Sequence, residues 1–300
     1  MTTTTTKQTY NHSEYLVETD WLEAHLDDSN LLIFDCTVSA HSNPDKSARF
    51  PFAFTNGITN FDEGHIPGAG FLDLLGSLSD RTSELPFLMP PEQQLASAFA
   101  KAGINDDSRV VLYGTTDPIW AARVWWMLRS LGFKNAAVLN GGWRKWSAED
   151  RPTSTKACTY SPGLFTARAQ PGCFANKEDV LAAIGNKYIR TINALPSMIH
   201  SGEGGPVFGR KGRIAGSVNV PFSSLHDPDT GAYFPADQLQ EKFQAVGVED
   251  AKQIIVYCGS GIAASNDAFA LALLGYDNVT VYDQSLAEWG YDTSLPMEDG

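Results

Sequence analysis

The residue best placed to do chemistry is Cys258, which stands between an apolar run and a glycine-rich turn. The segment 257–265 reads YCGSGIAAS and continues the apolar run 254–257. This pattern predicts a strand that ends at Tyr257, a short loop, and a helix that begins near Ala263. In open α/β sheets, ligands bind where strand ends meet helix N-termini. We therefore expect Cys258 to lie in a site of that kind.

The two glycines of this loop explain how the thiol could become a nucleophile. Gly259 and Gly261 let the backbone curl until several N–H groups point at one place, where the helix dipole adds partial positive charge. The thiol of Cys258 would lose its proton more easily there, and a persulfide anion would be stabilised by the same donors. The alternative is a small buried apolar residue, which the position at the turn disfavours. We expect substrate contacts from the loop at Gly259, Gly261, Ile262 and Ala263.

The remaining cysteines lack such surroundings. Cys36 ends an apolar run and is interpreted as a core residue, whereas Cys158 and Cys173 flank a proline-containing linker. No two cysteines form a CxxC pair, and none stands near a histidine at the spacing of zinc ligands. We therefore expect no metal, no cofactor and no disulfide framework.

The chain repeats itself at a nearly constant distance. The pairs include Gly103-Ile104 with Gly247-Val248 and Val110–Tyr113 with Ile254–Tyr257, both 144 residues apart, and Trp146 with Trp289, 143 residues apart. A steady offset over several blocks indicates two copies of one domain in tandem. At the same offset Cys258 aligns with Gly114, so the first copy lacks the nucleophile and we expect one active site per chain.

Each copy alternates short apolar runs with helical segments. The runs are 31–35, 110–113 and 136–139, then 188–193, 254–257 and 279–282; the helical segments include 92–102, 121–130 and 266–274. The alternation predicts an α/β fold in which each domain is a parallel sheet with helices on both faces. We predict a first domain without the nucleophile over 12–150, a linker over 151–172 and a catalytic domain over 173–300.

The composition argues against several classes of partner. The formal net charge is −13, and such a surface repels nucleic acid and anionic membranes, so neither is expected as a partner. No apolar run reaches the length of a transmembrane helix, and the first residues lack the apolar core of a signal peptide. A reducing cytoplasm is the simplest compartment.

Three motifs resemble the tandem-domain rhodanese family. They are CGSGIAAS at 258–265, GHIPGAGF at 64–71 and GSVNVPF at 216–222. The likeness is greatest to the 3-mercaptopyruvate sulfurtransferases and extends over residues 15–298. It implies an enzyme in which Cys258 takes sulfur from a small donor as a persulfide. The sulfur then passes to a thiol, cyanide or a thioredoxin-like acceptor.

The resemblance also implies roles for two further side chains. In mercaptopyruvate enzymes a loop serine is proposed to relay protons with a histidine and an aspartate of the first domain. Ser260 matches the serine and His65 matches the histidine, while no residue stands at the spacing of the aspartate. Each has a structural alternative, Ser260 as a turn-forming residue and His65 as a hydrogen-bonding residue of its own turn.

The loop also bears on the sulfur donor. Thiosulfate-selective members carry basic residues directly after the cysteine, whereas both positions here are neutral, which favours 3-mercaptopyruvate. The arginines that hold the donor's charge in the family are missing, and Leu195 and Ile199 occupy that segment. We consider Arg210 and Arg213 as substrate-binding replacements; the alternative is that they belong to a solvated loop.

Three other functions were weighed. A cysteine phosphatase needs an arginine six positions after the cysteine to grip phosphate, and Ala264 stands there, which argues against that class. A rhodanese-family sulfurtransferase that uses thiosulfate or another less usual donor fits the missing arginines. A non-catalytic rhodanese-fold binding module fits them too, although it has no physical need for an intact Cys258 loop.

Overall fold

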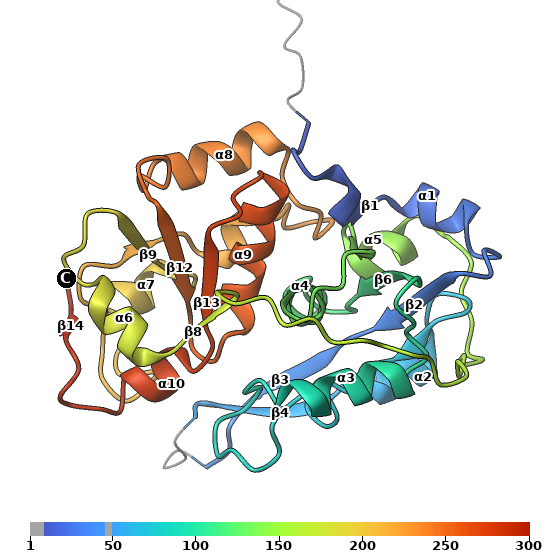
Figure 1. The fold of residues 1–300 in the computed structure, drawn as a ribbon, viewed down its shortest axis with the longest axis horizontal. Helices are drawn as coiled ribbons and strands as arrows, with labels where there is room; N and C mark the ends of the chain where they lie inside the picture. Colours follow the sequence, from blue (N-terminus) through green and yellow to red (C-terminus); the bar gives the residue numbers. More distant parts are fainter. Residues whose placement is uncertain (1–8, 46–49) are drawn as a thin grey trace, which may run out of the picture.

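The computed structural model describes residues 9–45 and 50–300, which form two α/β domains packed side by side (Figure 1). The first sheet has the order β1-β7-β6-β2-β5 and the second the order β11-β9-β12-β13-β8. Every pair of neighbouring strands within these two sheets is parallel. The predicted α/β fold with two parallel sheets is confirmed.

The strands of both sheets are short and mostly buried, as the apolar runs predicted. In the first sheet they are β1 (Leu16–Val17), β2 (Leu31–Asp35), β5 (Gly70–Phe71), β6 (Arg109–Tyr113) and β7 (Ala136–Leu139). In the second they are β8 (Phe174–Ala175), β9 (Ile189–Asn193), β11 (Val218–Asn219), β12 (Gln253–Tyr257) and β13 (Val279–Tyr282). The two central strands, β6 and β12, begin 144 residues apart, which is the offset found in the sequence.

Helices cover the sheets. They are α1 (Thr19–Ala24), α2 (Ile58–Glu63), α3 (Glu92–Lys101), α4 (Ile119–Ser130) and α5 (Gly142–Ala148) in the first half. The second half has α6 (Lys177–Ala183), α7 (Ser197–His200), α8 (Ala236–Gln244), α9 (Ile262–Leu273) and α10 (Ser285–Trp289). None of the helices in residues 9–45 and 50–300 has the length and apolar character that a membrane span needs.

The most extensive contact between the two domains is that of α4 with α9 (Figure 1). Every residue of α9 is buried, and the rings of Trp125 and Phe269 meet edge to face at 4.9 Å across the interface. α9 is rich in apolar residues and also buries Ser265, Asn266 and Asp267, so it needs protein contacts on every side. The contact between α4 and α9 therefore fixes the position of the loop that precedes α9.

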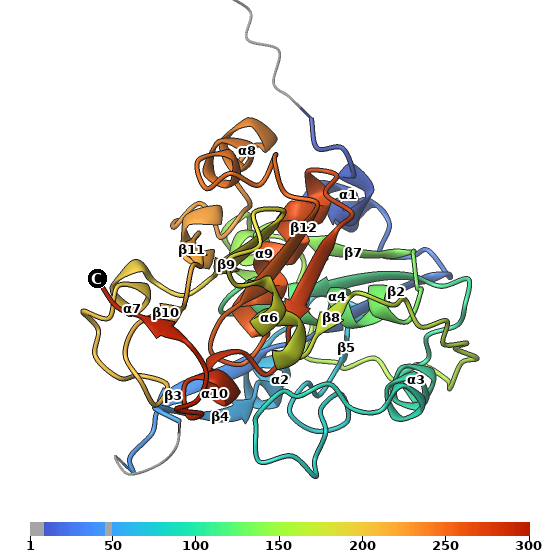
Figure 2. The same cartoon turned by 60° about the vertical axis from the view of Figure 1, so that its left-hand side comes forward.

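Two small antiparallel pairs extend the repeated unit. The hairpin of β3 (Val38–Ser42) and β4 (Phe52–Asn56) projects from the first domain towards the end of the second domain that carries α10 (Figure 2). In the second domain, β10 (Arg213–Ile214) pairs with β14 (Met297–Glu298) and ties down the C-terminal segment. The strands of the two sheets fall on either side of the predicted linker 151–172, and the domain boundaries themselves stay a prediction.

Candidate active site

Cys258 follows β12 directly and lies beneath the protein surface, with 2% of its area exposed. Its backbone N–H donates to the hydroxyl of Ser285 at 3.0 Å, and its carbonyl accepts from the N–H of Leu286 at 3.1 Å. The loop after the strand is thus tied to the start of α10, an element that the chain reaches 27 residues later.

The loop backbone presents several donors to the sulfur. Burial raises the pKa of the Cys258 thiol, while the N–H groups of Ala264, Ser260 and Ala263 and the hydroxyl of Ser285 act in the opposite direction without offsetting burial. Backbone amides at a helix N-terminus stabilise an anion. The site is therefore prepared to hold a negatively charged sulfur although the resting thiol is protonated.

Gly261 begins α9 in a conformation that favours glycine. Its φ is +78°, and a Cβ at this position would lie 2.8 Å from both the carbonyl oxygen and Oδ1 of Asp283. The left-handed turn brings the amides of Ala263 and Ala264 round to the sulfur side of the loop. This requirement explains the glycine that the sequence pattern singled out.

Ser285 is a site residue that the sequence did not reveal. Its φ is +51°, one of three positive values among the described non-glycine residues, and its hydroxyl donates to the carbonyl of Tyr282 at 2.7 Å while accepting from Cys258. A left-handed serine is strained by about 1–2 kcal/mol. Such strain persists only where the surroundings hold the residue in place, and it is frequent at functional sites.

Phe208 covers the loop on one side. A Cβ on Gly259 would lie 2.3 Å from Cζ of the Phe208 ring, and Phe208 itself is buried. The space that a side chain at position 259 would need is therefore filled by an aromatic ring. No charged group can replace Gly259 without moving Phe208.

Arg210 holds the Phe208 segment in place. Its guanidinium donates to the carbonyls of Trp289, Gly290, Asp292 and Leu295 at 2.9, 3.2, 2.7 and 2.9 Å. Arg213 donates to the carbonyl of Gly300 at 2.8 Å and pairs with Glu298 at 3.5 Å. We had expected both arginines to bind the donor's charge. In this structure both guanidinium groups contact the C-terminal segment, and their role in substrate binding stays a prediction.

His65 lies inside the first domain. It is fully buried, its Nδ1 lies 2.7 Å from the carbonyl of Phe61, and its ring stacks on the Phe61 ring at 3.9 Å. Its backbone pairs with Ser154 of the linker. Among residues 9–45 and 50–300, no hydrogen bond, ion pair or ring contact joins it to the Cys258 loop. We had expected His65 to approach that loop. Its contacts with Phe61 and Ser154 lie within the first domain and the linker segment, and a catalytic role for His65 stays a prediction.

Ser260 remains a candidate, because it sits on the loop itself and is partly exposed. Ile262 and Ala263, which we also expected near the substrate, are buried at the start of α9. The described part of the chain holds no cluster of three His, Cys, Asp or Glu side chains that could bind a metal ion. The other cysteines are not paired with one another, and Cys36 is fully buried in the core.

The equivalent loop of the first domain lines a pocket of about 190 Å³ and has Gly114 in place of the cysteine. The N–H of Thr115 donates to the hydroxyl of Thr37 at 2.8 Å, and the carbonyl of Gly114 accepts from the N–H of Trp143 at 3.1 Å. A Cβ on Gly142 would lie 2.7 Å from that carbonyl. The first copy thus lacks the thiol that the second copy offers.

A second buried feature missed by sequence reasoning is the ion pair between Arg123 in α4 and Asp283, which follows β13. Nη2 of Arg123 lies 2.6 Å from Oδ1 of Asp283, and both side chains are almost completely inaccessible to solvent. The pair joins the two domains beside Gly261. Its only sequence signal was an arginine in the middle of the apolar stretch at the start of α4.

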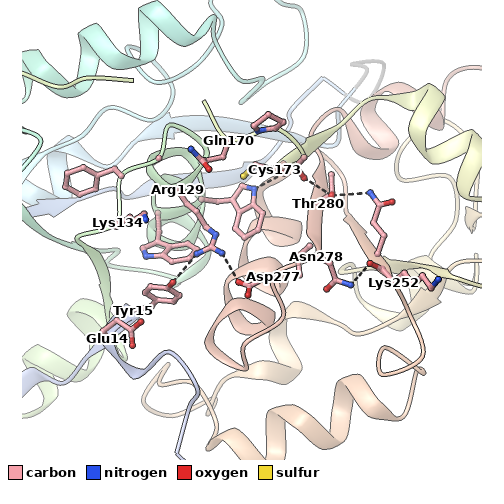
Figure 3. Close-up of a pocket in the computed structure, with 18 residues that line it drawn as sticks. Glu14, Tyr15, Arg129, Lys134, Gln170, Cys173, Lys252, Asp277, Asn278 and Thr280 are labelled. Carbon is pink, nitrogen blue, oxygen red and sulfur yellow. Dashed lines mark hydrogen bonds and ion pairs between the residues drawn. The ribbon is translucent and has the colours of Figure 1, made fainter. Parts of the chain in front are cut away.

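A cavity of about 730 Å³ lies elsewhere between the domains (Figure 3). Arg129, Trp126, Cys173 and Thr280 are among its lining residues, and Cys258 is not. The cavity borders the beginnings of β12 and β13, whereas Cys258 follows the end of β12. The two places are therefore at opposite ends of the second sheet.

The chain was compared with known proteins. The rhodanese-like domain family matches residues 18–149 and 203–292. The 3-mercaptopyruvate sulfurtransferase of Escherichia coli is 34% identical over 95% of this chain and 98% of its own length. The thiosulfate sulfurtransferase of Rattus norvegicus is 32% identical over 76% of this chain and 78% of its own. The crystal structure of SseA from Escherichia coli superposes with a TM-score of 0.77 at 33% identity, covering 90% of this chain and 98% of SseA.

Proposed function

The chain belongs to the rhodanese family of sulfurtransferases, and on that premise we propose that it moves sulfane sulfur from 3-mercaptopyruvate to an acceptor through a persulfide on Cys258. The observation that carries the proposal is the position of Cys258, which follows β12 directly, precedes the left-handed turn at Gly261 into α9, and has its N–H held by Ser285. The first-domain copy, with Gly114 at the equivalent position, has no thiol there.

The proposed reaction has two halves. In the first, the Cys258 thiolate attacks the sulfur of 3-mercaptopyruvate and a sulfur–sulfur bond forms. The carbon–sulfur bond breaks, its electron pair stays on carbon as an enolate, and protonation of that carbon gives pyruvate. In the second, an acceptor thiolate attacks the outer sulfur, the sulfur–sulfur bond to Cys258 breaks, and the Cys258 thiolate is regenerated. Cyanide would take the sulfur in the same way and leave as thiocyanate.

The loop amides act on the charged forms of sulfur. Charge-assisted hydrogen bonds from backbone N–H groups are worth about 1.5–3 kcal/mol each. They stabilise the attacking thiolate and the persulfide anion more than the neutral thiol, so they favour the reacting states. Ser260, partly exposed on the same loop, is our candidate for carrying the proton to the enolate carbon.

The surroundings of Gly259 support 3-mercaptopyruvate as the donor. Phe208 fills the space where a basic side chain would stand, so the second charge of thiosulfate has no partner beside the sulfur. An unpaired charge in a buried site is costly. Leu195 is buried and Ile199 is partly buried in the segment where the family's arginines are expected, which makes this wall apolar.

A donor other than 3-mercaptopyruvate is the second candidate, and one observation favours it. The carboxylate of mercaptopyruvate also needs a partner, and Arg210 and Arg213 are both committed to C-terminal residues. Losing one charge-assisted contact costs about 1.5–3 kcal/mol, or about tenfold to a hundredfold in binding. We therefore expect a weak apparent affinity for mercaptopyruvate. As acceptor we propose a thiol, cyanide or a thioredoxin-like protein, and as compartment the cytoplasm, where the four unpaired cysteines would stay reduced.

The test is steady-state kinetics with both donors in the parent and in Cys258→Ser. We expect a higher kcat/KM with 3-mercaptopyruvate than with thiosulfate in the parent, and no transfer in the variant. A clear preference for thiosulfate would contradict the donor assignment. Turnover by Cys258→Ser would contradict the mechanism. As matched controls, Cys36→Ser, Cys158→Ser and Cys173→Ser should each keep measurable activity.

A further inference from the structure

The ion pair between Arg123 and Asp283 spans the domain interface at the edge of the Cys258 loop. Arg123 has no exposed area, and Asp283 has 7%. Besides the contact with Asp283 at 2.6 Å, Nη2 of Arg123 donates to the carbonyl of Phe87 at 2.7 Å, and Nη1 donates to the hydroxyl of Ser265 at 3.5 Å. Arg123, a side chain of the first domain, thus contacts Asp283 and Ser265 of the second domain.

Asp283 connects the ion pair with Arg123 to the Cys258 loop at two positions. Its carbonyl oxygen and Oδ1 pack against Gly261, the first residue of the turn into α9. Two residues later in the chain, Ser285 holds the N–H of Cys258. Asp283 therefore lies between the helix start that supplies the amides and the serine that anchors the cysteine.

The first domain holds Asp283 with more than Arg123. The N–H of Met89 donates to Oδ2 of Asp283 at 2.8 Å. Phe87, whose carbonyl accepts from Arg123, has a φ of +64° and packs on Phe54 of the β3–β4 hairpin at 4.7 Å. A phenylalanine in the left-handed region persists only where its surroundings hold it there. The segment 87–89 is thus shaped to place these two backbone groups on the pair.

Stability alone gives little reason for such a pair. Removing two charges from water costs several kcal/mol per ion, so a buried ion pair is often no more stabilising than apolar residues of similar volume. What a buried pair with additional hydrogen bonds supplies is a defined geometry. Here the geometry belongs to the Cys258 loop.

We propose that Arg123 and Asp283 are positioning residues, through which the first domain holds the Cys258 loop in the arrangement that directs its backbone amides at the sulfur and keeps the Cys258 N–H on Ser285. Neither side chain is proposed to touch the substrate. The inference rests on the proposed role of Cys258. It gives the first domain, which has no nucleophile, a defined part in catalysis.

The experiment measures the rate at which iodoacetamide alkylates Cys258 as a function of pH, read from the mass of the Cys258 peptide. The alkylation midpoint is the pH at which this rate is half its maximum. Asp283→Asn is the mildest variant, because the amide oxygen can still accept from Met89. Asp283→Asn removes a negative charge and leaves Arg123 unpaired, and both changes by themselves favour the thiolate. We nevertheless expect the alkylation midpoint to rise by about one pH unit, about a tenfold loss of thiolate at a given pH, because the loop amides move away from the sulfur. The kcat/KM for 3-mercaptopyruvate should fall at least tenfold, with kcat more affected than KM.

Arg123→Lys provides a second variant in case Asp283→Asn does not fold. Lysine keeps the charge but lacks the planar fork, so it cannot reach Asp283, Phe87 and Ser265 together. We expect the midpoint to shift in the same direction by a smaller amount. The matched control is Arg129→Met in the same helix. Arg129 also pairs across the interface, with Asp277 at 3.4 Å, but in a more exposed setting, and its loss should leave the midpoint and kcat/KM within about twofold.

A purely structural pair would lower the amount or the stability of folded protein and leave the alkylation midpoint where it is in the parent. That result, in a folded Asp283→Asn or Arg123→Lys, would overturn the proposal. Alkylation needs no sulfur donor, so the outcome is independent of the donor assignment. A parent that transfers no sulfur would instead speak against the proposed function.

Discussion

The hydroxyl of Ser285 offers a test in which two substitutions separate strain from chemistry. Ser285→Ala keeps the Cβ in the left-handed conformation and removes the oxygen that accepts from Cys258 at 3.0 Å. A buried donor left unpaired costs about 1–3 kcal/mol. Ser285→Gly removes the same oxygen but relieves about 1–2 kcal/mol of left-handed strain. The glycine variant should therefore be more stable than the alanine variant by about 1–2 kcal/mol, which urea denaturation can measure.

The rates of persulfide formation in the two Ser285 variants should not follow the order of their stabilities. Both variants lose the hydroxyl oxygen that anchors the N–H of Cys258 beside the loop amides, and a buried donor left unpaired costs about 1–3 kcal/mol. We expect single-turnover persulfide formation, sampled by rapid quench, to slow by about tenfold to a hundredfold in both. A glycine variant that matches the parent would refute the reasoning, because it would show that only the backbone shape of residue 285 matters.

Three further predictions concern the loop and the first domain. Gly259→Arg should abolish activity because the Phe208 ring lies 2.3 Å from the new Cβ position. Adding Phe208→Ala to this variant should restore folding and raise kcat/KM for thiosulfate above the value of the parent. Ser260→Ala should lower kcat more than KM in pyruvate-release assays; an unchanged kcat would assign Ser260 to the turn. Burial raises the pKa of Asp35 to about 6, so the parent loses stability as pH rises from about 4 to 6. Asp35→Asn, which places the residue found at Asn193 of the second sheet, should raise the free energy of unfolding by about 3 kcal/mol over the parent at pH 7 and leave it nearly equal to the parent at pH 4. A variant as stable as the parent at both pH values would contradict the effect of burial on Asp35.

The fold could be predicted from the sequence because its signal is local. The runs 31–35 and 136–139 are strands β2 and β7 with the predicted ends, and α9 begins one residue before the predicted start. Short apolar runs that alternate with helices leave few arrangements open, and the repeat at 144 residues required both halves to share one of them. The topology of the fold could therefore be predicted from the spacing of the apolar runs and from the internal duplication.

The nucleophile loop was predicted for a similar reason, since Cys258, Gly259 and Gly261 are contiguous. The surrounding groups were not, because they come from distant segments. Ser285 follows Cys258 by 27 residues and is identified only by its left-handed backbone. Phe208 lies 36 residues after the last position of the predicted linker and 50 before Cys258. Nothing in its sequence context indicates a ring over Gly259.

The arginine and histidine predictions show where reasoning from residue type ends. Arg210 was expected to meet an anionic substrate, and in the structure it contacts four backbone carbonyls. His65 was expected at the loop on the basis of a motif, and it stacks within its own domain. The charge of a side chain and the motif around it indicate what it can bind. Only the packing of distant segments decides which partner it contacts.

The central claim is that Cys258 carries the transferred sulfur, and the most direct test is the mass of its peptide after a single exposure to 3-mercaptopyruvate without acceptor. The account predicts that the Cys258 peptide gains one sulfur atom, that cyanide removes it, and that the peptides of Cys36, Cys158 and Cys173 keep their original masses. An unmodified Cys258 peptide alongside pyruvate release, or a persulfide on another cysteine, would contradict it.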